Sequence, residues 1–312
     1  MATDSKVLWV VTYHYVRDYA DTPYPNIKGL DVSSFHQQIE FLRGRCEMAD
    51  LSSALSFLNG DYAPARDLCL LTFDDGLKEH YDLVLPALQE RGLQAVFAII
   101  TGCADGTRVA SAHKNHLLMA TLPPEEYAER YRAMLDALGV VPVGEATPET
   151  VRATYQWDDE PTGRLKFLIN FQTPTEARDQ ILGELFREAF GAEDEFARDL
   201  YVNPAELREM QGDGMVIAGH SHTHSALSTL GDAQDEELRT CASWLRKNCS
   251  EQELWPFVYP FGRSNSFDAQ TVAAVEKNGF HCSFSTIEGA NVPGQDLFQL
   301  LRVDTNEVSK QL

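Results

Sequence analysis

Short, continuous apolar runs recur along the chain, and each has the length of a β-strand. The clearest are 7–13, 68–71, 95–100 and 215–218, which lack the regular polar alternation of a half-exposed strand. Such runs are typical of parallel strands that are buried on both faces. Three more strands are expected at 257–259, around 282–284 and around 298–303.

Segments with apolar residues at helical spacing separate these runs. Ser33 or Ser34 is expected to cap the first helix, Asp50 the second, and the pair Asn203-Pro204 to start a later one. Strands that alternate with helices of this length predict parallel βαβ units, and therefore an α/β fold. The expected helices are 32–43, one that ends at Asn59-Gly60, 81–90, 235–248 and 271–277.

The alternation stops between residues 103 and 203. This stretch has mostly helical patterns, among them 125–138 and 175–190, the second of which places its large apolar residues on one stripe. We expect a single domain, 1–312, with a helical insertion at 103–203 that acts as a lid or shapes the substrate site. The alternative is an appendage that only stabilises the fold.

Two adjacent carboxylates, Asp74 and Asp75, follow the strand at 68–71. Charge beside a buried strand is costly unless it is paired or binds a metal. In parallel sheets the functional residues gather at the carboxyl ends of the strands, where His14 also lies. Successive strand side chains point to opposite faces, so both acids reach one site only if the chain leaves strand geometry, which Gly76 permits. A simple turn or helix cap is the alternative.

His220 and His224 follow the strand at 215–218, and one helical turn or a tight loop can bring both imidazoles to the same side. Two imidazoles and one carboxylate make an open catalytic metal site, with coordination room for water and substrate. The second carboxylate is then available for proton transfer, and spacing alone does not order the two acids. The alternative is a pair of surface or core histidines, and His222 is expected to point away from both.

The composition limits the classes of binding partner and the cellular compartment expected for this protein. A formal net charge of −21 and a pI near 4.7 argue against nucleic acid and anionic membranes, because binding to phosphates rests on clustered Lys and Arg. The apolar segment 7–11 is too short for a signal peptide or a membrane span, so we expect a cytoplasmic protein. Six cysteines without C-x-x-C spacing indicate reduced thiols.

Several motifs resemble those of the polysaccharide deacetylases, carbohydrate esterase family 4. The segment 72–76 (Thr-Phe-Asp-Asp-Gly) is similar to the first motif of that family, and 220–224 (His-Ser-His-Thr-His) to its H-[ST]-x-x-H motif. The segment 259–262 (Tyr-Pro-Phe-Gly) resembles the proline-aromatic-glycine motif. The patterns at 13–16 and 113–116 resemble deacetylase-like proteins of surface-polysaccharide biosynthesis.

This resemblance implies a distorted (β/α) barrel of the polysaccharide deacetylase type with a large helical insertion. It also implies that Asp75, His220 and His224 bind the metal, that Asp74 is the general base, and that the backbone N–H of Phe261 stabilises the oxyanion.

The chain departs from the family pattern in two places. Many members carry an arginine where this chain has Val258, so an arginine from elsewhere, Arg263 or Arg302, is expected to orient the catalytic acid. Many members also place the histidine that acts as general acid in a late leucine-rich strand, which has none here. The leaving amine still needs a proton. His14 is the first candidate for that acid, and His113 the second.

The expected reaction is metal-dependent removal of an N-acetyl group from an amino sugar, such as a nucleotide sugar or a glycan precursor of surface polysaccharide. Zn²⁺ is the expected cofactor, while cobalt, manganese and iron stay open because the same ligands suit them. Tyr259, Phe261 and Arg302 are expected to contact the substrate. The alternatives are a hydrolase acting on an N-formyl group or another amide, and a catalytically silent carbohydrate-binding relative.

Overall fold

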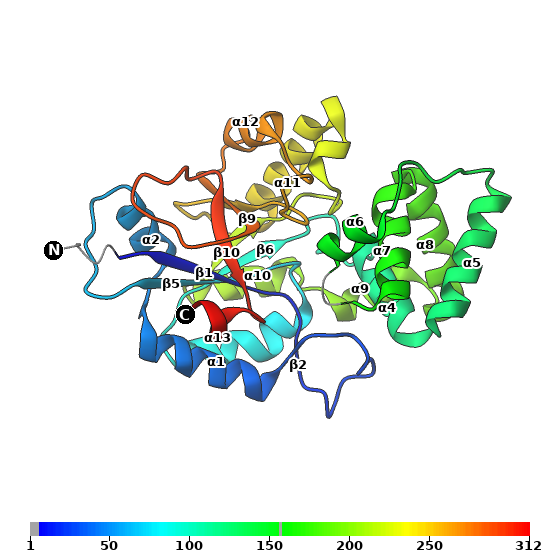
Figure 1. The fold of residues 1–312 in the computed structure, drawn as a ribbon. Coiled ribbons are helices and arrows are strands. Elements are labelled where there is room, and N and C mark those ends of the chain that lie inside the picture. Colours follow the sequence, from blue (N-terminus) through cyan, green and yellow to red (C-terminus); the bar gives the residue numbers. More distant parts are fainter. Residues whose placement is uncertain (1–5, 156–157) are drawn as a thin grey trace. The chain divides into compact units, whose positions relative to one another are not determined.

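The strands of the main sheet close into a parallel barrel. The computed structural model describes residues 6–155 and 158–312 (Figure 1). The strand order is β1-β10-β9-β8-β7-β6-β5-β4, and the additional pairing of β1 with β5 closes seven of these strands, all parallel, into a ring. The predicted α/β barrel is therefore confirmed. The ring consists of β1 (Leu8–Tyr13), β5 (Leu68–Phe73), β6 (Val96–Ile99), β7 (Val216–Gly219), β8 (Pro256–Val258), β9 (Cys282–Glu288) and β10 (Leu300–Asp304).

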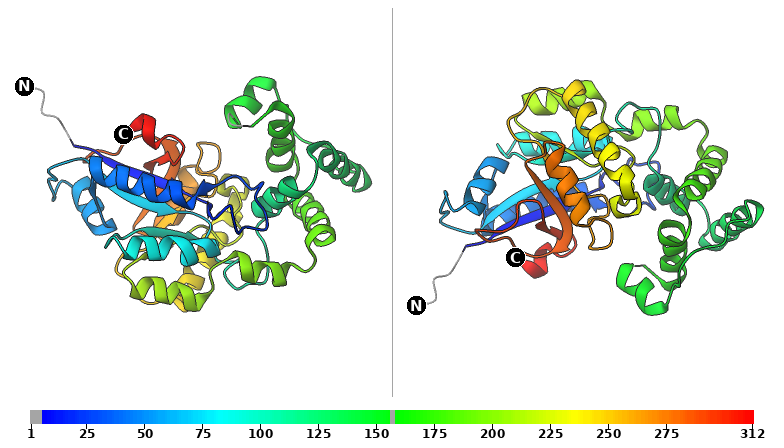
Figure 2. Two further views of the ribbon diagram at one scale, coloured as in Figure 1. Left: turned by 90° about the horizontal axis from the view of Figure 1, so that it is seen from below. Right: turned by 90° about the horizontal axis from the view of Figure 1, so that it is seen from above.

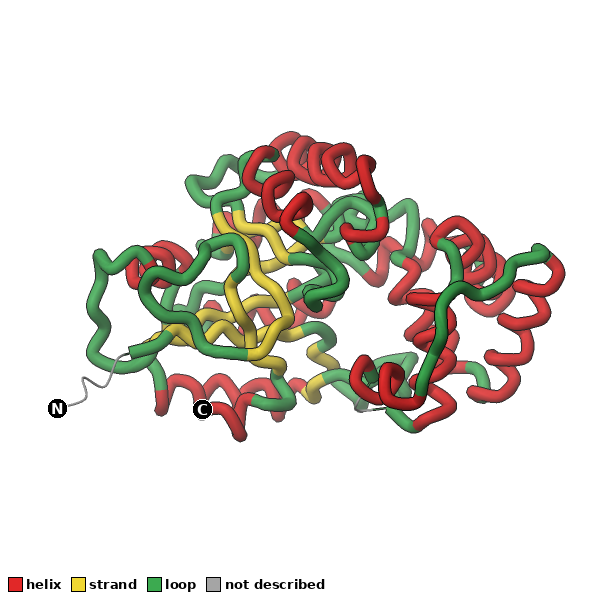
Figure 3. Tube along the Cα trace, turned by 45° about the horizontal axis from the view of Figure 1, so that its top comes forward, coloured by secondary structure: helices red, strands yellow, loops and turns green. Residues whose placement is uncertain are grey.

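Three short strands lie outside this ring. β4 (Glu47–Met48) pairs in parallel with the start of β5, on the edge that pairs with β6 further along. β2 (Val16–Arg17) and β3 (Leu30–Asp31) form a separate parallel pair just after the end of β1. All strands among the described residues thus lie within residues 8–99 or 216–304. Figure 3 shows the strands in yellow.

The two faces of the strands enter two different apolar clusters. One cluster joins strand residues to the flanking helices, whereas the other contains strand residues and the short helix α2 (Leu51–Leu58), and so fills the barrel interior. Val10 and Leu70 belong to the interior cluster. Because strand side chains alternate, Thr12 and Thr72 lie on that same interior face one step nearer the carboxyl ends.

Helices surround the barrel, as the two further views show (Figure 2). The N-cap of α1 (Val32–Arg45) is Asp31, whose side chain accepts from the Ser33 N–H, so the prediction of Ser33 or Ser34 is wrong by two or three residues. Asp50 caps α2 as predicted, and Asn203 starts α10 in a capping box with Glu206. The helices around the barrel are α1 (Val32–Arg45), α3 (Leu85–Gln89) after a π-helical turn (His80–Val84), α10 (Pro204–Gly212), α11 (Gln234–Asn248), α12 (Ala269–Lys277) and α13 (Val308–Gln311). Short 3₁₀ turns lie at Leu227–Thr229 and Gly231–Ala233.

Residues 109–196, with 23–27, form a second compact unit. The regular elements among its described residues are all helices. The predicted stripe of α8 (Thr175–Phe190) supplies Ile181, Leu182 and Leu185 to an apolar cluster with Tyr127 and Tyr131 of α5 (Pro124–Ala137). The sequence places the insertion at 103–203, slightly wider than this unit, and its role as a lid stays a prediction. The helices are α4 (Ser111–Thr121), α5 (Pro124–Ala137), α6 (Pro148–Thr154), α7 (Glu160–Phe167) with a π-helical turn (Leu168–Gln172), α8 (Thr175–Phe190) and α9 (Glu193–Leu200).

Two further properties follow from the described residues. Their helices are all too short or too polar to cross a lipid bilayer. No disulfide joins the six cysteines.

Candidate active site

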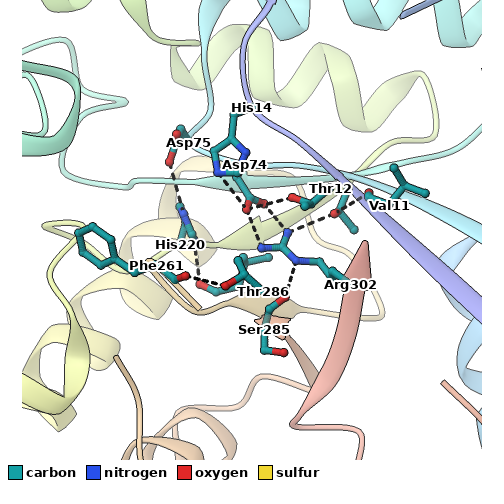
Figure 4. Close-up of polar contacts among 12 residues, drawn as sticks. Val11, Thr12, His14, Asp74, Asp75, His220, Phe261, Ser285, Thr286 and Arg302 are labelled. Carbon is teal, nitrogen blue, oxygen red and sulfur yellow. Dashed lines mark hydrogen bonds and ion pairs between the residues drawn. The ribbon is translucent and has the colours of Figure 1, made fainter. Parts of the chain in front are cut away.

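The candidate site lies at the carboxyl ends of the barrel strands. β5 leads into Asp74 and Asp75, β7 into His220, and β1 into His14. Because the strands are parallel, their carboxyl ends meet at one mouth of the barrel. Figure 4 shows these side chains converging from separate strands.

Asp74 and Asp75 point to different parts of the mouth because the backbone turns sharply at Asp75. Its φ is 80°, in the left-handed region that a non-glycine residue adopts at a cost of about 1–3 kcal/mol. Gly76 follows with a φ of 66°. The sequence attributes the change of direction to Gly76 alone, whereas the structure shows that Asp75 itself takes the strained conformation.

The histidine pair is carried by a tight loop rather than by a helical turn. Ser221 and His224 have φ angles of 58° and 59°, which no regular helix contains. The His224 N–H donates to the Ser221 hydroxyl at 2.9 Å. The Nε2 atoms of His220 and His224 lie 3.3 and 3.4 Å from Oδ1 of Asp75.

The arrangement of Asp75, His220 and His224 fits a divalent cation. One ligand atom from each of the three residues lies within 4.8 Å of the others. The Nδ1–H of His220 donates to the Val258 carbonyl at 2.8 Å, which fixes the orientation of the ring and turns Nε2 toward Asp75. Burial lowers the pKa of His220, but hydrogen bonding to Asp75 and the charge of Asp74 outweigh burial and raise that pKa. The pocket therefore favours positive charge at this position.

Asp74 is held by Arg302, which comes from β10. The guanidinium donates two parallel hydrogen bonds to the carboxylate, 2.8 Å to Oδ1 and 2.7 Å to Oδ2 (Figure 4). Burial raises the pKa of Asp74, yet the charge and hydrogen bonds of Arg302 outweigh it and lower the pKa to about 2. Thr12 adds a longer hydrogen bond to Oδ2 at 3.4 Å. Asp74 is consequently ionised at neutral pH.

The geometry corrects the prediction that Arg302 contacts the substrate. Its side chain is fully buried, and it also donates to the Thr72 hydroxyl at 3.2 Å and to the Ser285 carbonyl at 2.6 Å. These contacts occupy the guanidinium and fit its other expected role, which is to orient Asp74. Of the two arginines considered for that role, Arg302 rather than Arg263 lies on the carboxylate.

His14 is the candidate proton donor that the structure brings to the site. Its Nε2 lies 3.7 Å from Oδ2 of Asp74, and 44% of its side chain is exposed, so the ring can also reach a ligand at the mouth. The buried Nε2–H of His80 donates to the His14 carbonyl at 2.7 Å and anchors that segment. His113 lies in α4 of the second unit, where it is buried and its ring centre is 6.0 Å from that of His116. Its proposed catalytic role stays a prediction.

The turn after β8 separates Tyr259 from Phe261. Tyr259 is buried, donates its hydroxyl to the Phe298 carbonyl at 2.9 Å and stacks on Phe267 with ring centres 4.1 Å apart. The prediction that Tyr259 contacts the substrate is therefore wrong, because the ring faces the core. Phe261 is half-buried, its ring centre lies 5.1 Å from that of His224, and its φ is 62°.

Sequence reasoning misses the hydroxyl groups that support this site. Thr12 and Thr72 contact the Asp74–Arg302 pair, and Thr286 donates to the Phe261 carbonyl at 2.7 Å. A usable signal exists for the first two: each is a polar residue near the end of an apolar strand, on the face that continues toward Asp74. Thr286 lies at the partly exposed end of β9 and has no comparable signal.

The sequence of this chain matches a known protein family over most of its length. The model of the polysaccharide deacetylase family matches residues 61–159 and 176–283, which is more than half of the chain. The chain belongs to the polysaccharide deacetylase family. A relative described as a putative polysaccharide deacetylase, YxkH of Bacillus subtilis, is 28% identical over 103 residues, and that match spans 33% of this chain and 36% of the relative.

Several solved structures, among them two described as deacetylases, share the fold of this polysaccharide deacetylase family member. IcaB from Ammonifex degensii aligns with a TM-score of 0.59 at 16% identity, covering 98% of this chain and 95% of that one. PplD from Streptococcus pyogenes gives 0.56 at 14% identity with 96% and 91% coverage, and the BpsB deacetylase domain from Bordetella bronchiseptica 0.55 at 18% with 96% and 95%. At these identities the likeness shows the fold alone.

Proposed function

We propose that this protein is a divalent-cation-dependent hydrolase that removes an N-acetyl group from an amino sugar. The substrate class is a nucleotide sugar or a glycan precursor of surface polysaccharide. Membership in the polysaccharide deacetylase family supports deacetylation of a carbohydrate. The observation that carries the proposal is the convergence of Asp75, His220 and His224 beside the separately held Asp74.

Asp75, His220 and His224 would hold the cation, for which we propose Zn²⁺. The same donor set suits cobalt, manganese and iron. When bound, such a cation acts as a Lewis acid on a carbonyl and lowers the pKa of water from about 16 to about 7.

Asp74 is the proposed general base. Arg302 keeps the carboxylate ionised and fixes the plane of its two oxygens, so that a lone pair is always ready to accept a proton. The low pKa makes Asp74 a weak base, and catalysis by a weak base requires that the attacking water be acidified. A cation held by Asp75, His220 and His224 would meet this requirement.

The leaving nitrogen needs a proton as its bond to the carbonyl carbon breaks, because an amide anion is a very poor leaving group. His14 is the proposed donor, since its half-exposed ring lies beside Asp74 at the mouth. During attack the new C–O bond forms and the carbonyl oxygen gains charge. The backbone N–H of Phe261 is the proposed hydrogen-bond donor to that oxygen.

One observation weakens the alternative of a catalytically silent relative. The absence of an arginine at Val258 suggests that the catalytic acid has lost its partner. Arg302 supplies that partner from another strand, 228 residues along the chain from Asp74. The machinery for orienting the acid is therefore complete.

The direct test is release of acetate from a panel of N-acetylated amino sugars and nucleotide sugars by zinc-loaded protein. We expect acetate from at least one amino sugar, and loss of activity in Asp74→Asn and His220→Ala. Mass spectrometry of products from N-formyl and other amides identifies a different acyl specificity. Sugar binding without hydrolysis across the whole panel would contradict the proposal.

A further inference from the structure

The loop that carries the two metal-site histidines is strained and contributes little to its own stability. It leaves β7 at Gly219, and two of its residues, Ser221 and His224, have left-handed backbone angles of 58° and 59°. Within the loop, the bond from the His224 N–H to the Ser221 hydroxyl fixes one end of the turn. Neighbouring elements must therefore hold the rest of it in place.

The segment after β6 holds one side of this loop. The N–H groups of Thr101 and Gly102 donate to the carbonyls of Ser221 and His222 at 3.1 and 3.0 Å. Gly102 is needed for this approach, because a Cβ at that position would lie 2.5 Å from the His222 carbonyl oxygen. These contacts satisfy carbonyl groups of the loop but leave its N–H groups to other partners.

A single carboxylate oxygen holds the other side. Oε1 of Glu237, in the first turn of α11, accepts from the N–H of His222 at 2.8 Å and from the N–H of Thr223 at 2.6 Å. The same oxygen accepts from the Thr223 hydroxyl at 2.8 Å. Two consecutive N–H groups can converge on one acceptor only when the backbone between them is curved as it is here, and a negative charge strengthens each bond.

We propose that Glu237 is a positioning residue for the metal site: it fixes the curvature between His220 and His224 and so keeps both Nε2 atoms on Asp75. This inference deepens the proposed function and depends on it for the presence of a cation. Through Glu237, helix α11 would influence the affinity for the cation although it supplies no ligand. Groups hydrogen-bonded directly to a metal ligand typically change metal affinity by about 10- to 100-fold, and we expect an effect of the same order from Glu237, which acts through the backbone between the two histidines.

The neighbouring Glu236 gives a matched control. It lies in the same turn of α11, carries the same charge, and is exposed in an ion pair with Arg239. Glu236→Ala therefore makes the same change in net charge and in helix sequence as Glu237→Ala without touching the histidine loop.

The test is zinc affinity of the full chain, measured by competition with a chromophoric chelator and without any substrate. We expect Glu237→Ala to bind zinc about 10- to 100-fold more weakly than wild type, and Glu236→Ala to match wild type. Glu237→Gln keeps an acceptor oxygen but loses the charge, so a smaller loss is expected. Turnover of Glu237→Ala should recover partly at saturating zinc.

The outcomes separate this inference from the proposed function. Equal zinc affinity in Glu237→Ala and Glu236→Ala would overturn the positioning role while leaving the enzyme in place. Zinc binding by wild type without hydrolysis would overturn only the function. If Glu237→Ala does not fold, Glu237→Gln decides: weaker zinc binding than wild type supports the inference, and equal binding refutes it.

Discussion

Asp74 and Asp75 are adjacent in sequence, yet each belongs to a different region of the barrel mouth. The arginine side comprises Asp74, Arg302, Thr12 and Thr72, and the imidazole side comprises Asp75 with the two histidines. On the arginine side the protein itself supplies a full positive charge in a bidentate pair. On the imidazole side it supplies three ligand atoms clustered within 4.8 Å. The comparison shows that one residue with left-handed backbone angles directs two identical side chains to different partners: Asp74 to the guanidinium of Arg302, and Asp75 to the cation that we propose.

The largest effect should come from neutralising each acid in turn. Asp75→Asn should lose bound zinc and with it all measurable activity, because it removes the only carboxylate of the imidazole side. Asp74→Asn should keep zinc while kcat falls by about 10²- to 10⁴-fold, the range for loss of a general base. Zinc content per chain and kcat of both variants check this. Equal loss of zinc in the two variants would contradict the claim that Asp75 binds the cation and Asp74 does not.

Removing the Asp74–Arg302 pair should lower the free energy of unfolding, and it should affect zinc binding less. Arg302→Met leaves a buried carboxylate without its partner, a change that costs about 3–5 kcal/mol of unfolding free energy. Arg302→Lys keeps the charge but loses the bidentate geometry, so a smaller loss is expected. Urea unfolding of the zinc-free variants measures both. A change below about 1 kcal/mol in Arg302→Met would show that the pair is not held as described.

The arginine side should also set the response of stability to acid. The pKa of Asp74 is lowered from its usual 3.8 to about 2 in the folded protein, so the ionised form favours folding. The contribution, about 2 kcal/mol, is present above pH 4 and is lost as the pH falls toward 2. Unfolding free energies measured between pH 5 and 2 should show this loss in wild type and a flatter curve in Arg302→Met. Parallel curves for the two proteins would contradict the assignment.

The smallest effect should come from the turn beside the imidazole side. Thr286 donates to the Phe261 carbonyl and, through its N–H, to the Gly262 carbonyl at 2.8 Å, which holds the proposed oxyanion donor in place. Thr286→Val should lower kcat by about 10-fold, less than the 10²–10³ of a lost donor, with little change in KM. Thr286→Ser keeps the hydroxyl and should restore the rate. A rise in KM alone would indicate substrate contact instead.

The sequence predicts the barrel and the imidazole side because local patterns encode both. Continuous apolar runs define the strands, and Asp75 and the histidines stand directly after two of them, where parallel strands converge. The family motifs point to the same residues. The lid role of the insertion and the catalytic role of His113 stay predictions.

The arginine side is harder to predict because its partners are distant in sequence. Arg302 could be ranked with Arg263 but not chosen, since 228 residues separate it from Asp74 and only the closing of the ring brings β10 beside β1. Tyr259 shows the opposite case: the motif predicts contact with the substrate, whereas alternation along the chain turns its ring into the core. Glu237 has no local signal, because an acid in the first turn of a helix is ordinary.

The central claim is that three residues of the imidazole side hold a cation while Asp74 stays off it. Anomalous diffraction at the zinc edge from zinc-loaded crystals tests this most directly. We predict one peak about 2.0–2.2 Å from an oxygen of Asp75 and from Nε2 of His220 and His224, with Asp74 still paired to Arg302 and beyond bonding distance. A peak bonded to Asp74, or no peak between Asp75 and the two imidazoles, would contradict the account.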